Sequence, residues 1–103
     1  MANIELDFRN AKRQADKLEQ LAIELERLSS NKFDGTINDL SACWKGDNAN
    51  AYLQKAYKLE SDMKNTANDM RRTANQIRKT AKKIYDAEMY AKELAERRAY
   101  GRG

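Results

Sequence analysis

The stretch Cys43-Trp44-Lys45-Gly46-Asp47 is the tightest interruption of regular patterning in the middle of the 103-residue chain. Gly46 stands where the C-terminus of a helix favours a positive φ. Asp47 or Asn48 is a good N-cap for a helix that follows. Apolar patterns of helical spacing lie on both sides of this stretch. We therefore predict two antiparallel helices joined by a turn at residues 44–47.

Upstream of the turn, apolar residues at positions 8, 11, 15, 18, 22 and 25 alternate in steps of three and four. This is the heptad spacing of a helix that packs against another helix. After Leu28 the apolar stripe resumes at Phe33, shifted by about one residue, and Gly35 lies inside the shift. The pattern predicts a helix over about residues 5–43 with a kink, bulge or short break near 29–36.

Downstream of the turn, one apolar column recurs every seven residues. Its members are Ala56, Met63, Met70, Ile77, Ile84 and Ala91. Nothing in this region breaks a helix, so we predict one long helix over about residues 48–97 and a frayed tail over 98–103, where glycines replace the apolar period. The chain has no Pro and no Val, and its few Ile and Thr follow helical spacing. The predicted fold class is all-α.

Each helix carries an apolar band that is wider than the seam between two helices can cover. A single hairpin would therefore leave a large apolar surface in water. Pairing with a second hairpin, which gives a four-helix bundle dimer, removes this surface from solvent. The residues expected in the bundle core are Leu18, Leu25, Leu59, Met63, Met70, Ile77 and Ile84.

The residue types argue against catalysis. The chain has no histidine and one cysteine, Cys43, so one chain cannot assemble a zinc-ligand set, a Ser/His/Asp triad or a Cys/His dyad. The carboxylates are scattered among basic residues at the spacing of a helix surface, with no apolar pocket sequence around them. We predict a protein that is not an enzyme and that uses no cofactor or metal.

The first residues, Met1 to Asp7, include neither a basic region nor an apolar run, so they do not resemble a secretory signal peptide. No apolar stretch is long enough to span a membrane. Taken alone, these features predict a cytoplasmic protein, unless a dedicated secretion machine reads another signal.

Charge is unevenly distributed along the chain. Residues 1–46 carry 7 Lys+Arg and 8 Asp+Glu, whereas residues 47–103 carry 13 and 8. The basic excess lies between Lys64 and Lys83, and it includes Arg71, Arg72, Arg78, Lys79, Lys82 and Lys83. A basic helix can bind phosphates, but no aromatic residues are interleaved here. A solvated face or an acidic protein partner is favoured over specific nucleic-acid binding. The Ala, Thr and Met stripe beside it is too small for stable membrane insertion.

The sequence Trp44-Lys45-Gly46, in the middle of a helical chain of this length and followed by Ala49 and Tyr52, resembles the WXG family of type VII secretion substrates, of the early secreted antigenic target type. The resemblance covers nearly the whole chain. It implies that the turn at Trp44 and Gly46 is recognised by the type VII secretion ATPase. It also implies a helical partner, which could be a second copy, a related hairpin, or the helical N-terminal domain of a larger toxin. The protein would be made in the bacterial cytoplasm and exported to the extracellular space without a cleavable signal peptide.

The chain departs from the family pattern in two features, one at Asn48 and one in the C-terminal motif. Asn48 occupies a position where the family has a small residue. The C-terminal family mark, a tyrosine followed four residues later by Asp or Glu, is not matched, because the acidic residues come one position early. The candidate export signal is thus Tyr85 with Glu88 and Tyr90 with Glu93, or else the partner supplies it.

Trp44 itself has two interpretations: a plug at the end of the bundle, or a protruding docking residue. Gly46 is interpreted as a structural cap. Two other functions stay open from the sequence: a basic helical dimer that binds nucleic acid, and a cytoplasmic coiled-coil adaptor.

Overall fold

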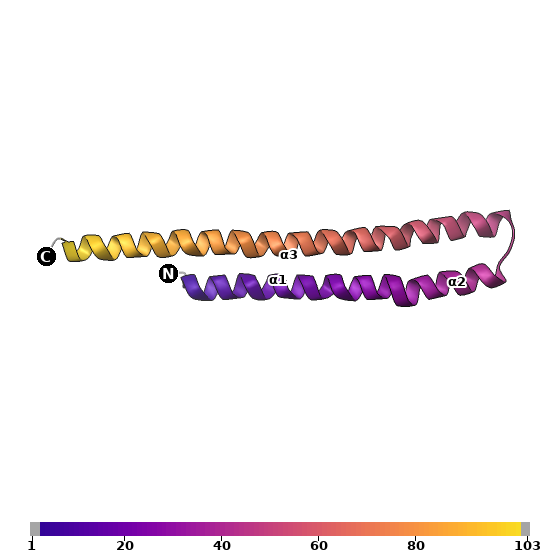
Figure 1. The fold of residues 1–103 in the computed structure, drawn as a ribbon, viewed down its shortest axis with the longest axis horizontal. Coiled ribbons are helices and arrows are strands. Elements are labelled where there is room, and N and C mark those ends of the chain that lie inside the picture. Colours follow the sequence, from indigo (N-terminus) through magenta and orange to yellow (C-terminus); the bar gives the residue numbers. More distant parts are fainter. Residues whose placement is uncertain (1–2, 102–103) are drawn as a thin grey trace. The chain divides into compact units, whose positions relative to one another are not determined.

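The computed structural model describes residues 3–101, and four helical elements account for nearly all of them (Figure 1). These are α1 (Ile4–Arg27), the π-helix η1 (Leu28–Phe33), α2 (Asp34–Cys43) and α3 (Asp47–Gly101). No strand occurs among the described residues, which confirms the all-α class. The helix expected to end near residue 97 continues to Gly101, because no helix-breaking residue precedes that glycine. Residues 102 and 103 of the predicted frayed tail lie outside the described part.

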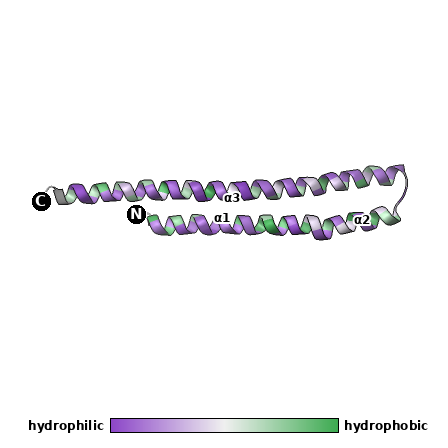
Figure 2. Cartoon of the chain, in the orientation of Figure 1, coloured by the Kyte–Doolittle hydropathy of each residue, from purple (hydrophilic) through white to green (hydrophobic). Residues whose placement is uncertain are grey.

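Local chemistry explains where α1 begins and why it persists. The Asn3 side chain caps the helix, because its Oδ1 accepts a hydrogen bond from the Leu6 backbone N–H at 2.9 Å. Glu5 and Asp7 lie in the first turn, where their negative charges offset the positive end of the helix dipole. Hydrophobic and hydrophilic residues are interspersed along the helices (Figure 2), and the apolar residues recur at steps of three and four. The helices are therefore amphipathic, as the heptad spacing predicts.

The π-helix η1 (Leu28–Phe33) overlaps the interval near residues 29–36 where the sequence predicts a kink, bulge or break, and it begins one residue earlier. The Asp34 backbone N–H donates to the carbonyl of Ser29, five residues earlier, which is the π-helical bonding pattern. This wider turn accommodates one residue more than an α-turn. The extra residue accounts for the one-residue shift of the apolar stripe between Leu28 and Phe33, and the chain absorbs the shift without leaving a helical conformation.

The chain divides into two compact units. The first unit consists of Met1–Lys17 and Thr73–Gly103, and the second of Leu18–Arg72. In the first unit, the rings of Phe8 and Tyr85 lie 4.7 Å apart, and the Arg78 guanidinium contacts the Asp16 carboxylate at 2.7 Å. The later residue of α1 thus meets the earlier residue of α3. Contacts in this unit run in opposite directions along the two segments.

The second unit shows the same order of contacts. The Arg71 guanidinium forms an ion pair with the Glu26 carboxylate. Further along, the Ser29 hydroxyl donates to the Glu60 backbone carbonyl at 3.3 Å. Nearest to the turn, the Tyr57 hydroxyl donates to Asn38 Oδ1 at 3.2 Å. Within this unit, the closer a residue is to the turn on its N-terminal side, the closer its contact in α3 is to the turn on the C-terminal side.

Small side chains occupy most of the buried apolar positions. The buried apolar residues are Ala15, Ala22, Ile37, Ala49, Leu53, Ala67 and Ala74. Five of these seven are alanines, so each removes little apolar area from water. Most large apolar side chains consequently lie outside the buried positions, on the flanks of the helices.

Candidate functional site

The turn between α2 and α3 is the candidate recognition site, and it consists of Trp44, Lys45 and Gly46. Trp44 leaves α2 with an extended backbone, φ −118° and ψ 113°, while its N–H still donates to the Leu40 carbonyl at 2.9 Å. Gly46 has φ +118° and its carbonyl accepts from the Asn50 N–H at 2.9 Å. Gly46 therefore stands immediately before α3. The sequence predicts it directly after the C-cap of the preceding helix, but that C-cap is Trp44, so Gly46 lies one residue beyond the expected position.

Gly46 has a conformational role at this turn. A Cβ atom at this position would meet no other atom within 4 Å, so space does not require glycine. The positive φ does, because side chains of L-residues strongly disfavour it. Gly46 thus allows the chain to enter α3 at Asp47, shortly after the extended Trp44. The backbone at Trp44 and Gly46 therefore sets the position of the Trp44 side chain at the turn.

Trp44 belongs to an exposed aromatic pair. Its ring stacks on that of Tyr52, with centroids 5.9 Å apart and planes inclined by 20°. The Lys55 ammonium lies 5.4 Å from the centroid of the Tyr52 ring. Trp44 is 39% exposed and Tyr52 60% exposed. The chain therefore leaves both rings of this pair partly exposed to solvent, with a cation beside one of them.

The residues of the candidate export signal differ in their surroundings. Tyr85 is half-buried against Phe8, and Glu88 is half-buried as well. Tyr90 and Glu93 are exposed. The structure thus places Tyr85 in a ring contact within the chain, whereas Tyr90 has its ring in solvent. Of the two tyrosines, Tyr90 is the one that a receptor could reach without a change in packing.

The predicted bundle-core residues flank the buried positions of α1 and α3. Leu18, Leu25, Met63, Met70 and Ile77 are half-buried. Leu59 and Ile84 are 51% and 52% exposed. In α3 the most buried column contains Glu60, Ala67 and Ala74, which lies next to the predicted column of Met63, Met70 and Ile77. The predicted core residues therefore keep part of their apolar surface exposed to solvent.

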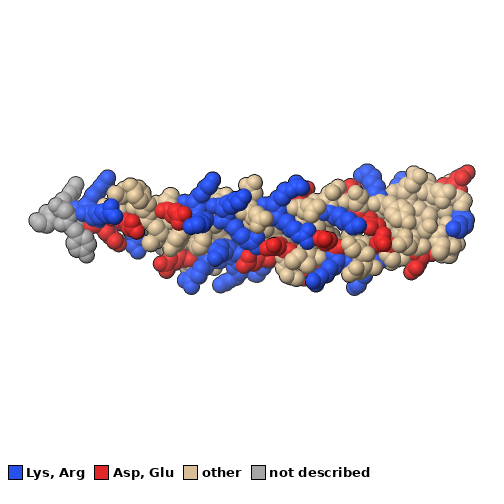
Figure 3. All heavy atoms as spheres, in the orientation of Figure 1, with Lys and Arg blue, Asp and Glu red and all other residues tan. Residues whose placement is uncertain are grey.

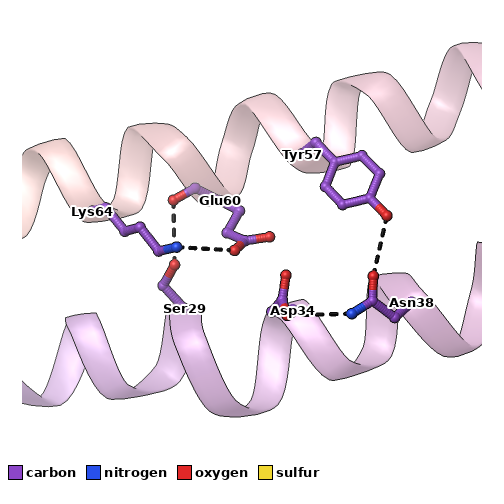
Figure 4. Close-up of polar contacts among 6 residues, drawn as sticks. All are labelled: Ser29, Asp34, Asn38, Tyr57, Glu60 and Lys64. Carbon is purple, nitrogen blue, oxygen red and sulfur yellow. Dashed lines mark hydrogen bonds and ion pairs between the residues drawn. The ribbon is translucent and has the colours of Figure 1, made fainter.

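A buried polar cluster lies beside η1, and the sequence analysis did not identify it (Figure 4). Ser29 is fully buried, and Glu60 is 7% exposed. The Glu60 carboxylate pairs through Oε1 with the Lys64 ammonium at 3.2 Å. The sequence did hold a signal, because positions 15, 22 and 29 form a seven-residue series of small residues. Glu60 lies seven residues before Ala67 in the buried column of α3.

Ion pairs occupy much of the basic region. Arg71 pairs with Glu26, Arg72 with Asp69 at 3.2 Å, Arg78 with Asp16 at 2.7 Å, and Lys82 with Asp86 at 3.2 Å. Acidic side chains are accordingly interspersed among the basic ones on the visible face (Figure 3). Because these four basic residues and Lys64, which pairs with Glu60, already have carboxylate partners, the region is less available to phosphates than its sequence indicates.

The described residues include neither a metal-ligand cluster nor a helix that could span a membrane. No group of three or more His, Cys, Asp or Glu side chains is placed to hold a metal ion. No described helix has the length and apolar character needed to cross a membrane. Comparison of the chain with protein-family models, with curated proteins and with solved structures gives no match.

Proposed function

We propose that this protein is a small helical substrate, or an export partner, of a type VII secretion system. In this role the chain folds as a helical hairpin, pairs with another helical hairpin into a four-helix bundle, and is recognised by the secretion ATPase. It is made in the bacterial cytoplasm and reaches the extracellular space without a cleavable signal peptide. Its work is protein recognition rather than catalysis.

The observation that carries this proposal is the exposure of Trp44 within the turn formed by Trp44, Lys45 and Gly46. A tryptophan is usually largely buried, and leaving it in water is unfavourable unless a partner covers it. Its stacking on Tyr52 holds the indole in place, so little ordering would be needed on binding. These features favour a docking residue over a plug at the bundle end.

Two further observations support the hairpin and its pairing. In each unit the contacts between the segments run in opposite directions, as expected for two antiparallel helices. The buried positions are largely alanines, while large apolar residues such as Leu21, Leu28 and Leu59 are exposed. A second helical chain would cover this apolar surface. That chain could be a second copy, a related hairpin or the helical N-terminal domain of a larger toxin.

The alternative of nucleic-acid binding has less support, because Arg71, Arg72 and Arg78 are held by carboxylates of the same chain. If the protein contacted a nucleic acid only through its phosphates, binding would depend strongly on salt concentration and would show no sequence preference. We observe nothing specific that favours a cytoplasmic coiled-coil adaptor over export.

Export can be tested by producing the full chain in a bacterium that carries a type VII secretion system. The chain is expected in the culture medium of cells with an active secretion ATPase, and only inside cells whose ATPase carries an inactivating Walker-motif substitution. A cytoplasmic marker protein measured in the same medium controls for lysis. Retention in both strains, even when genes for candidate partner hairpins are supplied, would refute the proposal.

A further inference from the structure

An apolar groove lies in the first unit, where the beginning of α1 meets the later part of α3. Ile4 and Phe8 contribute to it from α1, and Ile84 and Tyr85 from α3. Its volume is about 180 Å³. The Phe8 and Tyr85 rings are in contact, with centroids 4.7 Å apart. All of these residues belong to the same compact unit, so the groove is a property of that unit.

Two carboxylates line this apolar groove, Asp7 from α1 and Glu88 from α3. Asp7 is exposed and Glu88 half-buried. Neither forms an ion pair within the described residues, unlike Asp16, Asp69 and Asp86. The Lys12 ammonium lies over the Phe8 ring, 5.4 Å from its centroid. The groove therefore combines apolar walls with two carboxylates that have no ion-pair partner among the described residues, in a chain whose net charge is +4.

The size and chemistry of the groove select its occupant. Pockets that enclose small molecules have volumes of roughly 300–1,000 Å³, so this groove suits a single side chain better than a cofactor. Lysine and arginine bury an apolar stem and keep a charged head in a polar environment. We propose that the groove receives a Lys or Arg side chain from the contact face of a helical partner protein. The inference deepens the proposed function, and it rests on that function for the presence of a helical partner.

Other occupants fit the groove less well. A purely aliphatic side chain would fill the apolar part but would remove water from the two carboxylates without replacing their hydrogen bonds, which is unfavourable. An isologous contact between this groove and the same groove of a second copy would bring together two Asp7 and two Glu88 carboxylates. Like charges at such a contact repel each other. A cationic side chain compensates both carboxylates and also uses the apolar walls.

Binding of stapled helical peptides to the full-length chain tests this inference. Three peptides share one leucine-bearing face and differ only at its central residue, which is lysine, norleucine or glutamate. Norleucine keeps the aliphatic stem of lysine without its charge. We expect the lysine peptide to bind about threefold to tenfold more tightly than the norleucine peptide, as two partly exposed charge-assisted contacts allow. The glutamate peptide should bind weakest, and the NMR shifts caused by the lysine peptide should centre on the methyl groups of Ile4 and Ile84.

A charge-neutral variant provides the second arm of the experiment. Asp7→Asn with Glu88→Gln preserves side-chain size and should abolish the preference for lysine over norleucine. Asp39→Asn with Glu96→Gln makes the same change in net charge at two exposed positions, and should leave the preference intact. Equal affinity of the lysine and norleucine peptides for the unaltered chain would overturn the inference. NMR shifts that map away from the groove would also overturn it. Absence of peptide binding would overturn it as well, and so would sedimentation data showing that a second copy of the chain already covers the groove. Because the assay contains no secretion apparatus, its failure is distinct from a failure of export.

Discussion

Trp44 is the residue on which the proposed recognition depends most directly. Replacing Trp44 with Ala removes its stacking on Tyr52 and an indole that is 39% exposed. The expected loss of unfolding free energy is modest, because it consists of about 0.5–1.5 kcal/mol for the aromatic pair together with the apolar area that the partly exposed indole buries. Export should fall severely while thermal unfolding, followed by circular dichroism, remains cooperative.

Two controls make the Trp44 experiment specific. Trp44→Phe retains an aromatic ring and should restore part of the export. Tyr57→Ala removes another exposed aromatic side chain from the same unit, and should have little effect on export. If Trp44→Ala leaves the chain unfolded, the tryptophan is a structural plug, and the docking role assigned to it is wrong.

Ser29 is a residue at which a larger side chain should be poorly tolerated. It is fully buried, and its hydroxyl donates to the Glu60 carbonyl. Ser29→Leu should destabilise the chain by about 1–3 kcal/mol through overpacking, whereas Ser29→Ala should lose only one hydrogen bond, about 0.5–1.5 kcal/mol. The neighbouring exposed Ser30 provides the matched control. Denaturant titrations in which Ser29→Leu and Ser30→Leu unfold at the same midpoint would contradict this placement.

At the scale of the elements, η1 should tolerate the loss of one residue. Buried positions in the first half of the chain step by seven from Ala15 to Ala22 and Ser29, and then by eight to Ile37. Deleting the exposed Asn31 makes the last step seven, so a regular α-helix would keep Ile37 on the buried face. We expect a melting temperature close to that of the unaltered chain.

Deletion of the exposed Gln20 in α1 is the matched control for this experiment. There the turn is already α-helical, and removal of one residue rotates the flanking parts of the helix by about 100° relative to each other. Buried alanines on one side of the deletion would leave the contact face, so a clear loss of stability is expected. Equal melting temperatures for the two deletions would show that η1 does not compensate for an extra residue.

The C-terminal part of α3 is the element expected to carry any export signal of this chain. Removing residues 85–103 takes away Tyr85, Glu88, Tyr90 and Glu93, together with the ring contact of Phe8. The second unit, Leu18–Arg72, is left complete. We expect a helical protein that still pairs with its partner but is not exported. Normal export of the truncated chain alongside an intact partner would assign the signal to the partner instead.

The whole molecule is expected to pair with a second helical chain. Light scattering should give a mass above that of one chain, or a co-expressed partner should be needed for a stable protein. Met70 is half-buried and lies beside the alanine column. Met70→Asp should abolish pairing, because a partner would bury the unpaired charge at a cost of several kcal/mol. Gln76→Asp adds the same charge at an exposed position and should leave pairing unchanged. A sharply melting monomer at micromolar concentration would contradict the dimer.

The sequence by itself determined the helical class, the position of the turn and the interval of the π-helix. Local features are sufficient for these, because the chain has no Pro and keeps heptad spacing, Gly46 is needed for a positive φ, and the apolar stripe shifts by one residue after Leu28. The turn at Trp44 was also identifiable from local sequence, because Trp44 and Gly46 lie between two stretches of helical spacing. Its exposure was not, since exposure depends on which side chains surround the indole.

Only the tertiary structure decided which column of each helix is buried. Adjacent columns share the seven-residue period, so spacing cannot distinguish the column of Ala67 and Ala74 from that of Met63 and Met70. The choice depends on how two segments distant in sequence pack together, and the small residues allow the contact while the larger ones remain on its flank. The same packing placed Ser29 against Glu60 and brought Asp7 and Glu88 to one groove. A seven-residue series of small residues can mark a contact face, but it does not identify which residue of the distant segment lies opposite, so these sites required the structure.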